Sequence, residues 1–398
     1  MKNVILLTID ALRKDSLGCY GGAGLSPFLD SIQERCFRFN NDYSGGPYTQ
    51  AGFPPILSSS YYLDFGRIKG KCPPGRVLIP QVIKKHGIDS AAFHSNAYLA
   101  AFFGWNRGWD VYFDSMDMQV TEKRPYIPAW DINKKALEWL QRRRGNEPFF
   151  LWVHYMDTHE PYIAEEKYLQ KVDPNLRISQ DEQFGLFKDV ILKRDLSSKD
   201  AVETLRKLYL AKVAEVDAAA EELFGFFRET GHENDVIIIT SDHGEEFNDH
   251  GGLSHDGKMF DELVNVPLII YDPCLEKGVV SNAIASNLDI PPTITYLFGV
   301  DPDGSWQGES LLPLEEYSRK GAFAESIDKQ GAHEKGNEPE VHMYREGNLK
   351  IIYREGDDEW QLYDLENDPK EQEDIFGKYT TSEYLMRRVI PRVGRYKE

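Results

Sequence analysis

Short runs of apolar, often β-branched residues alternate along the chain with longer stretches in which apolar residues recur every three or four positions. Most of the short runs are apolar on both faces, which is typical of buried strands in a mainly parallel sheet, and the longer stretches have the period of amphipathic helices. This alternation predicts an α/β fold with helices on both faces of a mainly parallel sheet. The predicted strands are 3–9, 90–94, 148–156, 236–240 and 266–271, and the predicted helices include 28–36, 77–85, 132–143 and 198–230.

The sequence pattern changes after about Pro313. Residues 321–326, 342–353 and 360–365 have the pattern of short strands separated by polar turns, and a charged, helical tail follows them. We therefore expect a main domain over residues 1–313 and a smaller C-terminal subdomain of antiparallel sheet and helix over residues 314–398.

The composition excludes several classes of protein. A chain of 398 residues with 41% hydrophobic residues can bury a large core, which excludes disorder, a fibrous repeat and a disulfide-stabilised miniprotein. A net charge of −19, from 46 basic and 65 acidic residues, argues against a sequence-independent nucleic-acid or anionic-membrane partner. Four widely spaced cysteines fit reduced thiols, and the first apolar run is too short for a signal peptide or a membrane span. We expect a soluble, cytoplasmic protein, whose oligomeric state the sequence does not determine.

Polar residues follow several predicted strands, at the edge where α/β sheets bind ligands. Asp10 ends the first strand, and Asp242 and His243 come directly after the strand 236–240. An adjacent aspartate and histidine at a strand end can both reach one metal ion, and Gly244 is expected to permit the turn that follows. The sequence therefore predicts a metal site at this edge of the sheet.

These motifs resemble those of the sulfatase branch of the alkaline phosphatase superfamily. The resemblance implies an alkaline phosphatase-like, three-layer α/β/α fold, a divalent metal ion, and hydrolysis of a small phosphate or sulfate ester by a metal-bound nucleophile at the tip of a short helix. It extends from the third residue to about Phe376 and rests on five segments in the order expected for the family: 3–13, 17–21, 241–245, 266–268 and 362–369.

The nucleophile position of the family falls on Thr49. The sulfatase signature is Cys or Ser, any residue, Pro, any residue, Arg, but Ala51 and Phe53 replace its proline and arginine. Sulfatases of this type oxidise the cysteine or serine to an aldehyde, whereas oxidation of a threonine would give a ketone. The resemblance thus implies that Thr49 works unmodified and that phosphate esters are preferred. Ser44 and Ser58 are the alternative nucleophiles.

The metal ligands also depart from the family pattern. Many sulfatases bind calcium through two consecutive aspartates after the first strand and an asparagine after the later aspartate, whereas this chain has Ala11 and His243 at two of these positions. Exchanging a carboxylate for an imidazole favours Mn²⁺ or Zn²⁺ over Ca²⁺ or Mg²⁺. The first ion is expected on Asp10, Asp242, His243 and the Thr49 oxygen.

Two further histidines match substrate-contacting positions of the family. His159 matches the histidine of its Pro-His-x-Pro segment and His255 matches a substrate-binding lysine, so one of them is expected to donate a proton to the leaving group. In related two-metal enzymes an aspartate and two histidines from comparable places hold a second ion. Asp157, His159 and His255 could do so here, which leaves one ion or two open. Asn96 is expected to bind an ester oxygen, with a role in a turn as its alternative.

Two other functions remain open, namely a mutase or alcohol-accepting transferase that uses the same site, and an inactive, metal-stabilised binding protein. The remaining polar residues have structural interpretations. Arg13 is expected to pair with Asp15 or Asp10, and Asp217 to be structural. Arg142 to Arg144 are expected to form a solvated helix end, His86 to lie at a helix C-terminus, and His232, His333 and His342 to be at the surface.

Overall fold

A computed structural model describes residues 2–66, 71–143, 147–232, 234–328, 338–378 and 381–395. Its centre is an eight-stranded sheet in which all neighbouring pairs are parallel except those that β9 makes with β2 and β6. The spatial order is β10 (Val279–Ser286), β2 (Cys36–Tyr43), β9 (Asn265–Tyr271), β6 (Val236–Thr240), β1 (Val4–Ile9), β5 (Phe149–Tyr155), β3 (Asp89–Phe93) and β4 (Val111–Phe113).

The five strands predicted from apolar runs are confirmed, each within one residue at either end. Three strands of this sheet were not predicted, namely β2, β4 and β10. β2 and β10, near one edge of the sheet, mix buried positions with partly or fully exposed ones, so they lack the continuous apolar runs from which the other strands were predicted. The predicted helix 28–36 is an α-helix over Pro27–Ser31 followed by a 3₁₀ helix over Ile32–Arg35, and Cys36 begins β2.

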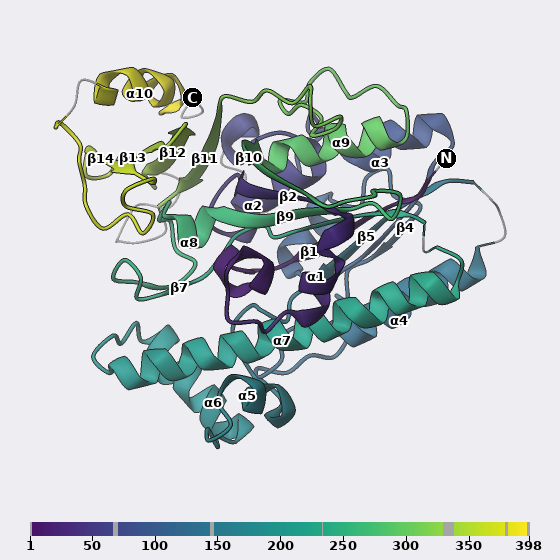
Figure 1. Ribbon diagram of the computed structural model, residues 1–398, viewed down its shortest axis with the longest axis horizontal. Coiled ribbons are helices and arrows are strands. Elements are labelled where there is room, and N and C mark those ends of the chain that lie inside the picture. Colours follow the sequence, from purple (N-terminus) through teal and green to yellow (C-terminus); the bar gives the residue numbers. More distant parts are fainter. Residues whose placement is uncertain are drawn as a thin grey trace.

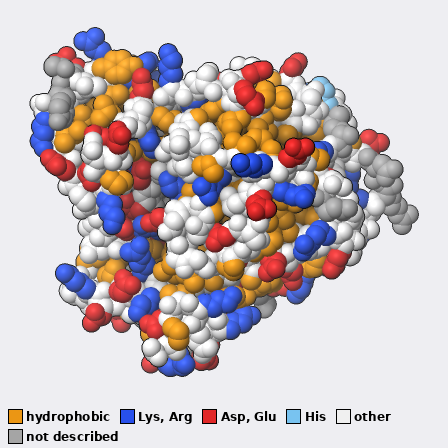
Figure 2. All heavy atoms as spheres, in the orientation of Figure 1, with side chains coloured by type: hydrophobic (Ala, Val, Ile, Leu, Met, Phe, Trp, Pro, Cys, Tyr) orange, Lys and Arg blue, Asp and Glu red, His pale blue; other side chains and the backbone are white. Residues whose placement is uncertain are grey.

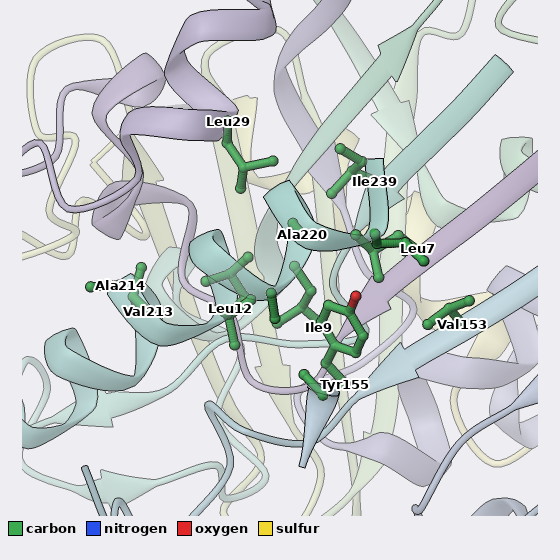
Figure 3. Close-up of a cluster of buried hydrophobic side chains, with 14 of the residues drawn as sticks. Leu7, Ile9, Leu12, Leu29, Val153, Tyr155, Val213, Ala214, Ala220 and Ile239 are labelled. Carbon is green, nitrogen blue, oxygen red and sulfur yellow. The ribbon is translucent and has the colours of Figure 1, made fainter. Parts of the chain in front are cut away.

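Helices cover both faces of this sheet, which confirms the three-layer α/β/α architecture (Figure 1). Successive residues of β1 alternate between two cores. Figure 3 shows part of one core, in which Leu7, Ile9 and Tyr155 of the sheet belong to the same buried cluster as Val213 and Ala220 of a long helix. This face carries α1 (Pro27–Ser31), α4 (Ala129–Arg142), α5 (Glu166–Val172), α6 (Gln180–Leu186) and α7 (Lys199–Glu229), and the other carries α2 (Thr49–Ser58), α3 (Ile79–Ile83) and α9 (Ile290–Leu297).

The expected C-terminal antiparallel sheet is present at one edge of the molecule (Figure 1). Its strands are β11 (Gly321–Ile327), β12 (Glu340–Glu346), β13 (Leu349–Arg354) and β14 (Glu359–Asp364), and α10 (Thr381–Val389) packs on it through Leu385 and Val389. The turns between β12 and β13 and between β13 and β14 lie where the polar residues predicted them. A domain boundary after residue 313 stays a prediction.

Hydrogen bonds join this small sheet to the segment before α2. The backbone N–H of Glu325 donates to the carbonyl of Gly45 at 2.9 Å, and that of Ile327 donates to the Tyr48 hydroxyl at 3.0 Å. Tyr48 is the residue directly before α2. The C-terminal sheet therefore supports the start of that helix.

The surface carries charges of both signs. Figure 2 shows Lys and Arg side chains intermingled with Asp and Glu rather than gathered into one basic patch on the visible face. Within the described ranges, no helix combines the length and the apolar character needed to cross a bilayer.

Two of the histidines expected at the surface lie elsewhere. His342 is fully buried on β12, where its Nε2 lies 2.9 Å from Glu340, so the prediction was wrong because this hydrogen bond replaces one to water. His232 is partly buried beside Asp235. His86 ends a short helix before Gly87, as predicted. His333 lies outside the described residues.

The predicted roles of the arginines and of Asp217 have mixed outcomes. Arg13 pairs with Asp15, as one alternative had it, and also with Asp249. Arg142 ends α4 with its side chain 80% exposed, as predicted, whereas Arg143 pairs with Asp89 and is only 11% exposed, so the prediction of a solvated residue was wrong there. Arg144 is outside the described residues. Asp217 is structural, since it accepts the N–H groups of the first turn of α1.

Candidate active site

The ends of two neighbouring parallel strands bring acidic residues together. β1 and β6 pair in register, so Asp10 and Asp242, each at or just beyond its strand end, reach the same edge of the sheet. With His243 they form the only group of three or more metal-ligating side chains among the described residues whose ligand atoms all lie within 4.8 Å of one another. We call Asp10, Asp242 and His243 the ligand cluster. All three are fully buried.

Three of the four carboxylate oxygens of this cluster have no hydrogen-bond partner in the described part of the chain. Asp10 Oδ2 accepts a hydrogen bond from Asn96 Nδ2 at 2.9 Å, but Asp10 Oδ1 and both oxygens of Asp242 have no hydrogen-bond partner. Burial, together with the charge of Asp10, raises the pKa of Asp242. Because buried charges are otherwise paired or bound to metal, the cluster fits a divalent cation.

His243 presents a lone pair to these carboxylates. Its Nδ1 lies 2.8 Å from the carbonyl oxygen of Gly244, which can only accept, so Nδ1 carries the proton. Burial and the neighbouring His255 lower the pKa of His243 to about 3, which keeps the ring neutral. Its Nε2 then faces Asp10 Oδ1 at 3.4 Å and Asp242 Oδ2 at 3.5 Å, an arrangement that a cation between them would stabilise.

Thr49 is the candidate nucleophile that the structure brings to the ligand cluster. It is the first residue of α2, and its Oγ1 lies 3.5 Å from each of Asp10 Oδ2, His243 Nε2 and Asn96 Nδ2. Ser58 ends the same helix, about 13 Å away along its axis, and donates to the Pro54 carbonyl.

The other alternative nucleophile, Ser44, lies on the segment between β2 and α2. Its hydroxyl donates to the carbonyl of Gly46 at 2.9 Å. Neither serine hydroxyl forms a hydrogen bond with the ligand cluster among those found in the described residues.

His159 and His255 lie on the more open side of the site. Their ring centroids are 4.9 Å apart, and that of His255 is 4.6 Å from the His243 ring. Both are partly exposed, whereas the ligand cluster is fully buried, so the two rings lie at the more exposed border of the site. Burial alone would lower the pKa of His159, but the charge of Asp10 outweighs it and raises that pKa.

Asp157 is engaged elsewhere. Its Oδ2 accepts the Ala129 N–H at the start of α4 at 2.9 Å, and its Oδ1 lies 3.4 Å from Lys212 Nζ. Across the described residues, Asp157, His159 and His255 do not form a metal-sized group. The structure thus brings the two histidines together without the aspartate that a second ion was expected to need.

Two residues near the site were given no role from the sequence. His154 Nε2 lies 3.4 Å from Asp10 Oδ2, on the strand next to β1, and its Nδ1 lies 2.9 Å from Thr8 Oγ1. Glu245 is fully buried and contacts His255. Glu245 is two residues after His243, and this place in the same motif could have indicated from the sequence that it lies near the site.

Gly244 serves packing rather than the turn that was expected of it. It is absent from the residues with positive φ, but a Cβ at this position would lie 1.9 Å from the backbone oxygen of Glu262. The residue with the left-handed conformation is Ala11, with φ 54°, directly after Asp10. Such strain is common beside functional groups.

Comparison with known families gives two matches. A family model described as Sulfatase matches residues 2–300, and one described as N-sulphoglucosamine sulphohydrolase, C-terminal, matches residues 250–390. A choline-sulfatase from Rhizobium meliloti is 30% identical over 426 residues, covering 93% of this chain and 81% of the relative. An N-acetylglucosamine-6-O-sulfatase from Bacteroides thetaiotaomicron is 23% identical over 465 residues, covering 94% and 83%.

Solved structures share the fold. One, determined in complex with its substrate D-glucosamine-2-N,6-O-disulfate, superposes with a TM-score of 0.76 at 21% identity, covering 100% of this chain and 98% of that chain. A phosphonate monoester hydrolase of Agrobacterium radiobacter superposes with a TM-score of 0.76 at 19% identity, covering 98% and 95%.

Proposed function

Because the chain belongs to the sulfatase family of the alkaline phosphatase superfamily, and is thus an ester hydrolase, we propose that it uses unmodified Thr49 as nucleophile and prefers phosphate esters. The observation that carries this proposal is the position of Thr49 Oγ1, at the start of α2 and 3.5 Å from both Asp10 Oδ2 and His243 Nε2. A hydroxyl at a helix N-terminus also lies where backbone N–H groups favour an anion.

The proposed cofactor is one divalent cation. Asp10 Oδ1, Asp242, His243 Nε2 and the Thr49 hydroxyl would hold it, and carboxylate and imidazole ligands together favour Mn²⁺ or Zn²⁺ over Ca²⁺ or Mg²⁺. Bound there, the ion supplies positive charge that lowers the pKa of the hydroxyl and offsets the charge of the ester. We propose one ion because Asp157 is engaged with Lys212 and α4. Elemental analysis that gives two metal atoms per chain would contradict this.

The side chains would divide the reaction among them. Thr49 Oγ1 would attack phosphorus once its proton has passed to water, and Asp10 Oδ2, 3.5 Å away, accepts the hydrogen bond that orients the hydroxyl. Asn96 Nδ2, 3.5 Å from the same hydroxyl, donates to an oxygen of the bound group. His255 or His159 protonates the leaving oxygen, and water then attacks the phosphothreonine and regenerates Thr49.

Chemistry at Thr49 supports the preference for phosphate esters. Sulfate release in sulfatases with the Cys/Ser-x-Pro-x-Arg signature proceeds through an aldehyde hydrate, which a threonine cannot form. A phosphoryl group on an unmodified alcohol can instead be removed by water attack at phosphorus. The fold is shared with a phosphonate monoester hydrolase, so this scaffold also hosts chemistry at phosphorus.

Rapid acid quench and intact-mass measurement test the nucleophile. With Mn²⁺ present, p-nitrophenyl phosphate or bis-p-nitrophenyl phosphate should be hydrolysed faster than p-nitrophenyl sulfate, and the quenched wild type should carry a phosphate adduct that maps to Thr49. Thr49→Ala should abolish the adduct, whereas Ser44→Ala and Ser58→Ala should keep it. An adduct on either serine, an oxidised residue 49, or faster sulfate turnover would overturn the proposal.

The composition supports a proposal for the location of the protein and for its ligand class. We propose a cytoplasmic protein because all four cysteines are unpaired, and a small ester as its ligand rather than nucleic acid because the net charge is −19. Titration of the thiols in denaturant without reductant tests the location, because four free thiols are expected.

A further inference from the structure

A cavity of about 480 Å³ lies beside residues 369–372, the segment that follows β14. Its other walls come mainly from the loop after β1, from α7, from α8 (Asp261–Val264), and from the loop between β7 (Glu246–Phe247) and β8 (Leu253–Ser254). Figure 1 shows β7 and α8 on the same side of the molecule as the C-terminal sheet. The volume falls within the range of about 300–1,000 Å³ that small-molecule sites occupy.

The cavity is separate from the candidate active site. Of the described residues that line it, none belongs to the ligand cluster, and none is Thr49, Asn96, His159 or His255. Charged side chains of both signs dominate its wall instead. The way in which these charges pair with one another decides which ligand the cavity suits.

Two acidic residues on the wall share one arginine. Arg13 Nε and Nη2 donate to the two oxygens of Asp15 at 2.9 and 2.8 Å, and its Nη1 and Nη2 donate to the two oxygens of Asp249 at 2.8 and 3.2 Å. Both carboxylates are therefore already paired with a buried cation. Arg206 is attracted by Asp15 and Asp249 but forms no ion pair with either.

The other acidic residues on the wall are also engaged. The fully buried Lys350 Nζ lies 2.7 Å from Asp261 Oδ1 and 2.8 Å from Glu371 Oε1. Glu262 Oε1 lies 2.6 Å from His250 Nδ1. No carboxylate among the described residues of the wall is thus left to neutralise a further cation.

Three further cations on the wall have no ion pair. Arg206 and Lys370 form neither a hydrogen bond nor an ion pair with any residue that the structure describes. Lys14 donates from its Nζ to the carbonyl oxygen of Asn40 at 2.9 Å. Burial, which outweighs the attraction of Asp261, lowers the pKa of Lys14, so the protein does not fully compensate this charge.

We propose that the cavity binds a small organic oxyanion, namely a compact organic group that carries a phosphate, sulfate or carboxylate, through Arg206, Lys370 and Lys14. Guanidinium and ammonium groups bind such anions through charge-assisted hydrogen bonds. An inorganic ion alone would leave most of the cavity to water. The three cations come from segments far apart in the sequence, so a bound anion would join these segments and stabilise the fold. The inference goes beyond the proposed function and does not depend on it.

Phenylphosphonate is a suitable probe, because it is an organic anion without an ester bond to hydrolyse. Calorimetric titration of the Mn²⁺-loaded full chain in about 0.15 M salt measures binding at every site. Inhibition of p-nitrophenyl phosphate hydrolysis measures binding at the active site alone. We expect Arg206→Gln/Lys370→Gln to weaken calorimetric binding at one site by at least about tenfold and to leave the inhibition constant unchanged.

A double variant with the same change in charge is the control. Lys207→Gln/Lys378→Gln also removes one cation from α7 and one from the C-terminal segment. Lys207 pairs with Asp173, Lys378 pairs with Glu373, and neither lysine lines the cavity. The control should therefore bind phenylphosphonate as the wild type does.

The outcomes separate this inference from the proposed function. Equal binding of phenylphosphonate by the wild type and Arg206→Gln/Lys370→Gln, or an equal loss in the control, would overturn the inference. So would a wild-type dissociation constant above about 10 mM, or equal binding of uncharged benzyl alcohol. Calorimetry does not require turnover, so an inactive wild type that binds the probe in the cavity would overturn the proposed function and leave this inference standing.

Discussion

Gly52 lies against the backbone of Asp242 so closely that a Cβ at position 52 would be 2.1 Å from the Asp242 carbonyl oxygen. Gly52 is in α2, three residues after Thr49, and Asp242 belongs to the ligand cluster. A glycine therefore sets the distance between the helix that carries the candidate nucleophile and the strand end that carries the carboxylates.

Replacing Gly52 tests this contact. In an unhindered helix, Gly→Ala stabilises by about 0.5–1 kcal/mol, but a Cβ at 2.1 Å from a backbone oxygen requires a shift of α2. We expect Gly52→Ala to lower both the unfolding temperature and kcat/KM, the latter by at least about tenfold. Gly225→Ala is the control, because Gly225 is also helical and has no neighbour within 4 Å of its Cβ position. A stabilised, fully active Gly52→Ala would contradict the interpretation.

Asp242→Asn should separate metal binding from folding. The two oxygens of Asp242 are buried without hydrogen-bond partners, so removing the charge should raise the unfolding temperature of the metal-free protein. Added Mn²⁺ should raise the unfolding temperature of the wild type but not of the variant, and elemental analysis should find the variant empty.

Asp15→Asn is the control for this prediction. Asp15 is 56% exposed and pairs with Arg13 on the same side of the sheet. It should keep the response to Mn²⁺, and an Asp242→Asn variant with full metal occupancy would remove Asp242 from the ligand cluster.

Thr49→Ser should keep the reaction. Serine retains the Oγ that lies 3.5 Å from Asp10 and His243 and loses only a methyl group. We expect kcat/KM within about tenfold of the wild type, whereas Thr49→Ala should fall by several orders of magnitude with its metal still bound. If the serine variant is as inactive as the alanine variant, the hydroxyl at position 49 is not the nucleophile.

His250 should make stability depend on pH. Burial alone would lower the pKa of His250, but its hydrogen bond to Glu262 at 2.6 Å outweighs this and raises the pKa above its usual value. Its Nε2 also donates to the Lys370 carbonyl at 3.0 Å, which ties the loop after β7 to the C-terminal segment. The charged ring thus stabilises the fold below about pH 6.5, and this contribution is lost as the pH rises through the raised pKa.

The measurement is a difference between two proteins. The gap in unfolding temperature between the wild type and His250→Gln should be largest near about pH 6 and should shrink towards about pH 8.5. Subtracting the variant removes the titration of every other group that both proteins share. A gap that stays constant or widens would show that the neutral ring of His250 stabilises the fold as much as the charged ring does.

Thiol reactivity should differ sharply between the native and unfolded protein. Burial raises the pKa of Cys19 and of Cys36 to about 12, whereas Cys274 is exposed. Without reductant, we expect rapid labelling of Cys274 alone in the native state and labelling of four thiols in denaturant. A count of two or none in denaturant would reveal disulfides and place the protein in an oxidising compartment.

The sequence predicted those parts of the fold that have a local signal. Strands buried on both faces, such as β1 and β6, are continuous apolar runs and could be located within a residue. The antiparallel direction of β9 has no such signal, because it depends on which neighbours the strand meets in space. The same holds for β2 and β10, whose partly exposed residues look like those of loops.

In the site, too, only features with a local signal in the sequence could be predicted. Asp10, Asp242 and His243 were predictable because each lies at the end of a strand, and the order of parallel strands brings such ends together. Asp157 also lies just after a strand, yet its carboxylate faces Lys212. Lys212 is distant in the sequence, and no motif in the sequence indicates that it is buried. The partner of His255 could not be identified for the same reason.

The hydrogen bonds from β11 to Gly45 and Tyr48 have a consequence for how such a protein can evolve. The residue that precedes the candidate nucleophile is held by a strand encoded almost three hundred codons downstream. A gene that exchanged its last portion for an unrelated module would leave the start of α2 without that support. We therefore expect the lineage to diversify through loops at the rim of the site, while both parts are inherited together.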